Sequence, residues 1–139
     1  MIQKRVALSV PTRGRGFTEI TGPVREAVRG SGVATGIALV FVRHTSASLC
    51  IQENADPAAR GDMERFLERL APEGDPEWRH VAEGPDDAPS HLRSLVTRTS
   101  ETIPVAGGDL DLGTWQGLFL CEHRAGRRTR EVLVHVLGE

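Results

Sequence analysis

The apolar residues of this chain recur with the period of a β-strand in its first and last thirds, and with the period of a helix mainly in its middle. Runs typical of strands lie at residues 4–10, 16–21, 35–42, 101–105, 109–112, 116–123 and 130–137. The run 35–42 is nearly all apolar, which predicts a strand covered on both faces. Gly107-Gly108 predicts a hairpin turn, and the last two runs are predicted to pair across a turn containing Gly126.

Two or three helices are expected between these runs. Pro23 suits the first turn of a helix that ends at Gly30. Asp56-Pro57 is a strong start for a second helix, whose apolar residues share one face: Ala59, Met63, Phe66, Leu67 and Leu70. After a loop at 75–90, residues 88–96 predict a short third helix with three inward-facing residues: Leu92, Leu95 and Val96. The fold class is therefore α+β with a mainly antiparallel sheet.

Length and composition limit the classes of protein that the chain can belong to. The 139 residues fit one domain, 1–139. The 17 basic and 19 acidic residues give a net charge of −2, which argues against a dedicated nucleic-acid binder. No uncharged stretch is long enough to span a bilayer, so we expect no membrane association and a cytoplasmic location. Cys50 and Cys121 lie far apart in apolar surroundings, which favours buried free thiols over a disulfide.

Three of the five histidines fall on three different expected elements. His44 directly follows a buried strand, His80 lies in the long loop, and His91 begins the third helix. Three such imidazoles could converge on one divalent metal that keeps water in a fourth position. Alternatively, each is an ordinary surface or hydrogen-bonded histidine, because their spacings match no local zinc motif. We expect His123 to be an exposed strand end and His135 a structural residue.

A second group of candidate residues surrounds Gly126 and consists of arginines: Arg124, Arg127, Arg128 and Arg130. Guanidinium groups bind phosphate in a bidentate manner, and a glycine turn lets backbone N–H groups contribute. The alternative is a solvated hairpin. Trp115 is either a core residue or a pocket wall with Thr114 and Gln116 as polar contacts. The absence of a Ser-His-Asp arrangement, a phosphate-cradling loop and a dinucleotide fingerprint leaves kinases, nucleotide triphosphatases and serine hydrolases without support.

Six ordered motifs together resemble one known family, the YjbQ family of small proteins described as secondary thiamine-phosphate synthases. The motifs cover nearly the whole chain: His44-Thr45-Ser46-Ala47-Ser48, Glu53-Asn54-Ala55-Asp56, Trp78-Arg79-His80, Glu83-Gly84-Pro85-Asp86-Asp87 with His91, Gly113-Thr114-Trp115-Gln116-Gly117, and Glu122-His123-Arg124 through Arg130. The resemblance implies a sheet curved into a half-barrel and assembly as a homotrimer. It also implies a divalent metal, expected to be zinc, on three matching residues: His44, His80 and His91.

Other matching positions are expected in the pocket. Three of them are expected to be catalytic: Asn54, Asp56 and Glu122. Three are expected to contact a phosphorylated substrate: Thr114, Gln116 and Arg130. Arg124 and Arg128 of the arginine turn are expected to join them as phosphate contacts.

The implied reaction joins a pyrimidine pyrophosphate to a thiazole phosphate and releases pyrophosphate and carbon dioxide. It needs an anion clamp and a cation, which the arginines and the metal could supply. However, the chain shows no Asp-rich Mg²⁺-binding pattern, and a histidine site suits zinc and water activation. Three hypotheses follow: a thiamine-phosphate synthase, a metal-dependent hydrolase of a phosphorylated metabolite, or a trimeric binding protein without catalysis.

Overall fold

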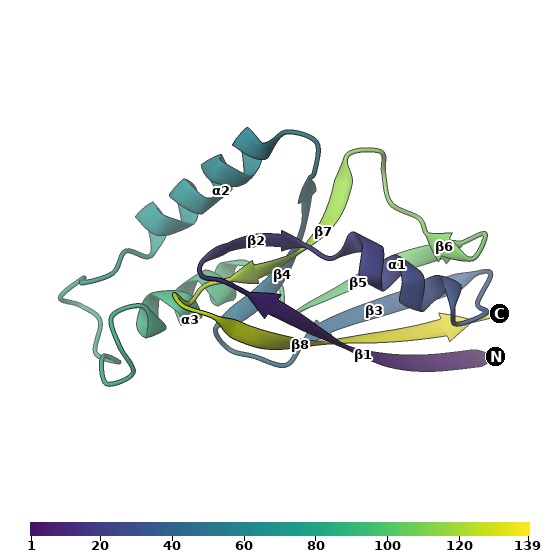
Figure 1. Ribbon diagram of the computed structural model, residues 1–139, viewed down its shortest axis with the longest axis horizontal. Helices are drawn as coiled ribbons and strands as arrows, with labels where there is room; N and C mark the ends of the chain where they lie inside the picture. The colour runs from purple at the N-terminus through teal and green to yellow at the C-terminus, as the bar shows by residue number, and fades with distance from the viewer.

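The computed structural model describes residues 1–139 as eight strands and three helices (Figure 1). In chain order these are β1 (Ile2–Thr12), β2 (Gly16–Glu19), α1 (Thr21–Arg29), β3 (Gly36–Val42), β4 (Ala47–Glu53), α2 (Pro57–Leu70), α3 (Asp87–Val96), β5 (Ser100–Ala106), β6 (Asp109–Leu110), β7 (Gln116–Glu122) and β8 (Arg128–Gly138). None of the helices has the length and hydropathy needed to cross a bilayer.

All strand pairs are antiparallel and form two sheets. One sheet has the order β1-β8-β3-β5-β6, and the other has the order β2-β7-β4. A bridge between Leu49 of β4 and Arg98, just before β5, connects them. The strands curl into a half-barrel with α1 packed on its core, which confirms the expected α+β class.

The core lies between the two sheets and α1. Alternate residues of β8 are fully buried, and the last four residues of β3 show the same alternation. Val24 and Val28 of α1 are also fully buried and cover this core. The period of two in the sequence thus marks the strand faces correctly, and Pro23 does lie in the first turn of α1.

Two expectations about the strands are wrong. The runs at 116–123 and 130–137 do not pair with each other: β7 pairs with β2 and β4, whereas β8 pairs with β1 and β3. The arginine turn is therefore a crossover between sheets, with Gly126 at a φ of +83°. In addition, β4 is a strand that was not expected from the sequence, although Ala47, Leu49 and Ile51 alternate with more polar residues there.

Several apolar faces that the sequence predicts to be covered are open in the single chain. Ile37, Leu39 and Phe41 form the outer face of β3 and are 42%, 39% and 40% exposed. Leu95 and Val96 of α3 are also exposed, contrary to expectation, and this helix instead buries Asp87, Pro89, Ser90 and Arg93. On α2, only Leu67 of the apolar face is buried.

Two glycines permit the close approach of β3 and β8. Gly36 lies directly opposite Gly138 in the register of the two strands. A Cβ at Gly36 would overlap the Leu137 carbonyl, and a Cβ at Gly138 would overlap the Thr35 carbonyl. Because these neighbours are backbone atoms, they cannot yield without moving a strand.

We expect Gly36→Ala to lower the free energy of unfolding by about 1–3 kcal/mol, since overpacking against backbone forces the strands apart. Urea denaturation measures this change. Gly22→Ala is the matched control, because Gly22 lies in α1 with open space around it and should leave stability unchanged or higher. Equal unfolding curves for Gly36→Ala and the parent would contradict the close-approach explanation.

Candidate metal centre

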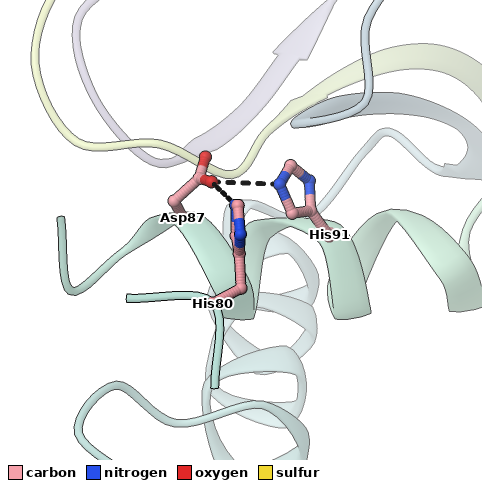
Figure 2. A group of neighbouring side chains, drawn as sticks. All are labelled: His80, Asp87 and His91. Carbon is pink, nitrogen blue, oxygen red and sulfur yellow. Dashed lines mark hydrogen bonds and ion pairs between the residues drawn. The ribbon is translucent and has the colours of Figure 1, made fainter. Parts of the chain in front are cut away.

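Three side chains gather at the N-terminal end of α3 and can offer ligands to a metal. The Nε2 atoms of His80 and His91 lie 2.6 Å and 3.0 Å from Oδ2 of Asp87, as Figure 2 shows. One ligand atom from each residue lies within 4.8 Å of the other two. Asp87 and His91 are one helical turn apart, and His80 comes from the preceding loop.

The tautomer of His91 follows from its second contact. Its Nδ1 lies 2.9 Å from the carbonyl oxygen of Thr45. Because a carbonyl can only accept, Nδ1 carries the proton and donates it. In neutral His91 the Nε2 atom then directs a lone pair at the Asp87 carboxylate. This contact is favourable only when His91 is doubly protonated or when a cation lies between the two atoms.

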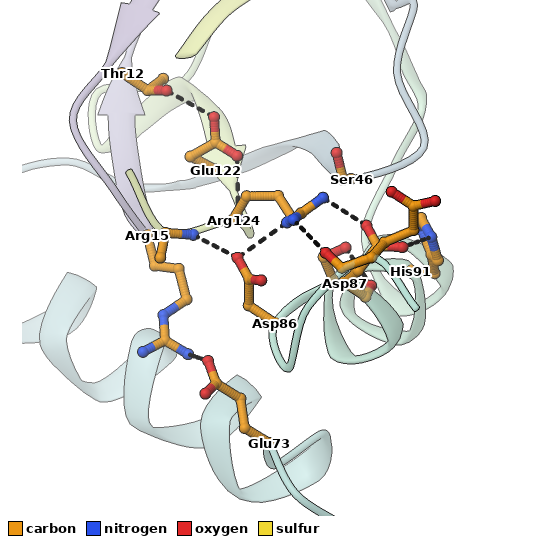
Figure 3. Close-up of polar contacts among 12 residues, drawn as sticks. Thr12, Arg15, Ser46, Glu73, Asp86, Asp87, His91, Glu122 and Arg124 are labelled. Atoms are coloured by element: carbon orange, nitrogen blue, oxygen red, sulfur yellow. Dashed lines mark hydrogen bonds and ion pairs between the residues drawn. The ribbon is translucent and has the colours of Figure 1, made fainter. Parts of the chain in front are cut away.

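Arg124 holds Asp87 from the opposite side, as Figure 3 shows. Its Nη1 donates to Oδ1 of Asp87 at 2.6 Å, and its Nε donates to Oδ2 of Asp86 at 2.9 Å. Burial acts to raise the pKa of Asp87, but the hydrogen bond from His80 and the charges of His91 and Arg124 outweigh it, so this pKa is lowered. Asp87 is therefore an oriented carboxylate anion.

The cluster is open to solvent on its histidine side. The side chains of His80 and His91 are 56% and 36% exposed, whereas that of Asp87 is 7% exposed. His91 also lines a cleft of about 930 Å³, together with His44 and Arg43. A cation bound here would keep coordination positions free on the side where a small molecule can approach.

The structure does not bring His44 into this cluster. Its Nε2 accepts the backbone N–H of Glu131 at 2.8 Å, and Nη1 of Arg130 lies 3.4 Å from its Nδ1. Burial and then the charge of Arg130 lower the pKa of His44. His44 is thus a neutral wall of the cleft that lies apart from the cluster of His80, Asp87 and His91, with one nitrogen bound to the backbone of β8.

Two arginines of the expected phosphate clamp, Arg124 and Arg130, are already paired with carboxylates of the same chain. Arg124 is held by Asp86 and Asp87. Arg130 is buried and binds both oxygens of Glu122, at 2.7 Å and 2.5 Å. These two guanidinium groups are therefore engaged within the chain, and phosphate binding by the arginine turn stays a prediction. Arg128 is half-buried, and its Nε has no hydrogen-bond partner.

Glu122 is a structural anion rather than an exposed catalytic group. Its side chain is 1% exposed, and besides Arg130 it accepts from the Thr12 hydroxyl and the Arg124 backbone N–H. Burial acts to raise the pKa of Glu122, but the hydrogen bonds from Arg130, Thr12 and Arg124 lower it below the usual range. Through these contacts, the charged carboxylate of Glu122 joins β1, β7 and β8.

The other expected pocket residues lie at the opposite end of the β4–β7 pair. Gln116 begins β7 and Glu122 ends it, a separation of roughly 20 Å along the strand. Asp56 is the N-cap of α2 and accepts from the backbone of Ala58. Asn54 donates to Glu19, and Thr114 is exposed. Within one chain these residues cannot share a site with His80 and His91.

Two functional or structural residues were missed by reasoning from the sequence. Asp87 was not expected beside His80 and His91, although its spacing of four residues from His91 places both on one face of a helix. His123 was expected to be exposed, but it is buried and hydrogen-bonded to Ser48 at 2.8 Å. Ser48 contacts the Thr97 hydroxyl, which itself donates to the carbonyl of Arg93. The burial of His123, with the nearby charge of Arg93, lowers its pKa to about 4.

We expect Arg130→Met to lower the free energy of unfolding by about 3–5 kcal/mol, because it leaves the Glu122 carboxylate buried without a cation. Arg43→Met is the matched control: its ion pair with Glu131 is about half exposed and should contribute less than ~1 kcal/mol. Chemical denaturation of both variants tests this difference. A loss of similar size in both would mean that the buried pair has no special role.

Comparison with known proteins places the chain in a family. The sequence profile described as UPF0047 protein YjbQ-like matches residues 6–139. A UPF0047 protein of Synechocystis sp. is 50% identical over 137 residues, covering 99% of this chain and 93% of that protein. The UPF0047 protein YjbQ of Salmonella typhimurium is 41% identical, with 99% and 98% of the two chains covered.

Solved structures agree with these sequence matches. A hypothetical protein of Aeropyrum pernix superposes with a TM-score of 0.90 at 34% identity, covering 98% of this chain and 99% of the other. A protein of unknown function from Sulfolobus solfataricus superposes with a TM-score of 0.87 at 27% identity, covering 99% of each chain. The chain thus belongs to the YjbQ (UPF0047) family.

Proposed function

We propose that this protein is a metal-dependent hydrolase of a phosphorylated small molecule, with one divalent cation, expected to be zinc, on His80, Asp87 and His91. The observation that carries the proposal is the contact between Nε2 of His91 and the Asp87 carboxylate. Donation from Nδ1 to Thr45 leaves Nε2 of neutral His91 with a lone pair aimed at an anion, and a cation between them would make this contact favourable without a second proton on His91.

The chemistry of the three donors suits this cation. Two imidazole nitrogens and one carboxylate oxygen are typical ligands of catalytic zinc, and such sites keep a position for water. When bound there, zinc would lower the pKa of its water ligand and polarise a phosphoryl oxygen. The exposed histidine side of the cluster is consistent with this open coordination.

The residues around His80, Asp87 and His91 have different roles in the proposed site. Thr45 fixes the ring of His91 through its carbonyl, and Arg124 fixes the Asp87 carboxylate. Arg43 lines the cleft, and its exposed ion pair with Glu131 is weak enough to be exchanged for a phosphate. We therefore assign phosphate recognition to Arg43, whose guanidinium is accessible, rather than to the arginines around Gly126.

The thiamine-phosphate synthase implied by the resemblance is the second candidate. The cleft, about 930 Å³ and open to solvent, leaves room for the two phosphorylated substrates that a synthase must hold together. The lack of a carboxylate-rich magnesium site favours the hydrolase over the synthase, since a pyrophosphate leaving group usually departs on magnesium.

The metal test uses protein stripped with a chelator and titrated with zinc by calorimetry. We expect about one zinc per chain, and a loss of affinity of more than about 100-fold in His80→Ala and in His91→Ala. His44→Ala should keep the parent affinity, because Nε2 of His44 is bound to Glu131. His135→Ala, on the outer face of β8, is the matched control. Parent affinity in both His80→Ala and His91→Ala would refute the centre.

The reaction test uses the zinc-loaded protein and a panel of phosphorylated metabolites. A hydrolase consumes a single substrate and releases inorganic phosphate or an alcohol. A synthase requires the pyrimidine pyrophosphate and the thiazole phosphate together and releases pyrophosphate. Saturable binding without turnover would support a binding protein and overturn both enzyme proposals. Arg43→Met should weaken substrate binding roughly tenfold or more without changing zinc affinity.

We also propose that three copies assemble, as the resemblance implies. The exposed apolar residues on the outer face of β3 support this proposal, because a neighbouring copy would cover them. Light scattering should give three times the chain mass of 15.1 kDa. Leu39→Glu places a charge in the middle of that face and should lower the measured mass, whereas a parent protein that is monomeric at micromolar concentration would rule the proposal out.

A further inference from the structure

The two cysteines lie side by side on neighbouring strands, although they are far apart in sequence. In the β4–β7 register Cys50 is opposite Phe119, and Cys121 is opposite Ser48, so the cysteines are diagonal neighbours on one face. Their sulfur atoms are 3.5 Å apart, and both thiols are free. This confirms the free thiols expected from the sequence and adds that they are in contact.

The two thiols differ in accessibility. Cys121 is 1% exposed, whereas Cys50 is only partly buried. Cys50 lines an apolar groove of about 680 Å³ that runs along α2 beside Phe66 and Leu67. Cys50 is therefore the more accessible of the two thiols, although Cys121 also borders a smaller pocket of about 230 Å³.

The thiols also differ in chemistry. The S–H of Cys121 donates to the sulfur of Cys50, which lowers the pKa of Cys50 against the opposing effects of burial and of the Glu101 charge. The same hydrogen bond and burial raise the pKa of Cys121. Arg98 also lines the groove and is the basic residue there. An accessible thiol of lowered pKa next to a second thiol is the arrangement of a redox-responsive cysteine.

We propose that Cys50 reacts with hydrogen peroxide and that Cys121 resolves the product into a reversible intramolecular disulfide. In the first step the Cys50 sulfur attacks one peroxide oxygen, the O–O bond breaks, and Cys50 becomes a sulfenic acid as one water leaves. In the second step the Cys121 sulfur attacks the Cys50 sulfur and the S–O bond breaks. The departing hydroxide takes the Cys121 proton and leaves as a second water.

The bond formed in this way should be easy to reduce. The sulfur atoms must approach from 3.5 Å to about 2.05 Å. Diagonal neighbours on paired strands are farther apart than directly opposed residues, so the bond pulls β7 along β4. A disulfide that strains its surroundings has a less negative reduction potential than a structural one, and a small dithiol reverses it.

The experiment treats the reduced full-length protein with increasing hydrogen peroxide and follows free thiols and intact mass. We expect both thiols to disappear together, the mass to fall by two hydrogen atoms, and dithiothreitol to restore the starting protein. Cys121→Ser should stop at the sulfenic acid of Cys50, which dimedone traps. Cys50→Ser is the matched control and should leave Cys121 unmodified, because that sulfur is buried.

Two results would overturn the proposal. One is a parent protein that gains oxygen atoms at Cys50 without losing the Cys121 thiol, which would mean that the second thiol does not resolve the first. The other is a Cys50→Ser variant whose Cys121 reacts at the parent rate. Thermal melting checks that each variant is folded, and Cys121→Ala replaces Cys121→Ser if the hydroxyl disturbs the core.

Discussion

The buried ion pair between Glu122 and Arg130 is the interaction on which the candidate site depends. Glu122 ends β7 in one sheet, and Arg130 lies on β8 in the other, so the pair joins the sheets where the chain crosses between them. Glu122 also binds the backbone N–H of Arg124, whose guanidinium holds Asp86 and Asp87. A continuous series of ion pairs and one backbone hydrogen bond therefore runs from the interior of the half-barrel to the proposed metal ligands.

Local features of the fold could be predicted from the sequence, whereas its long-range pairing could not. Period-two alternation identifies β1 and β8, and Asp56-Pro57 identifies the start of α2, because both signals arise from residues close in sequence. The partner of β7 is decided by packing between distant segments. The sequence of a glycine-containing turn is similar whether the turn closes a hairpin or crosses between two sheets. For this reason the pairing of β7 with β8 was wrongly predicted.

The candidate site shows the same division. The structure brings together His80 and His91, two of the three histidines that were grouped from the sequence, although nothing in their spacing says which other side chain lies beside them. Asp87 completes it because α3 places it one turn before His91, and the burial that orients it depends on Arg124. His44 shares the cleft with His91 but not its cluster, since the β8 backbone occupies its nitrogen. The sequence motifs indicate candidate residues, and only the three-dimensional contacts show which of these residues lie together.

The opposed glycines of β3 and β8 affect how these strands find their alignment during folding. Gly36 and Gly138 face each other where the backbones come closest. Sliding either strand by one residue would bring a side chain to that point and would turn the buried valines of β8 toward the outside. The steric overlap at the glycines and the exposure of the valines both disfavour a shifted register, so a sheet with that register would be unstable. The register of β3 and β8 is thus specified twice, by the close approach of the two backbones and by the burial of the valines.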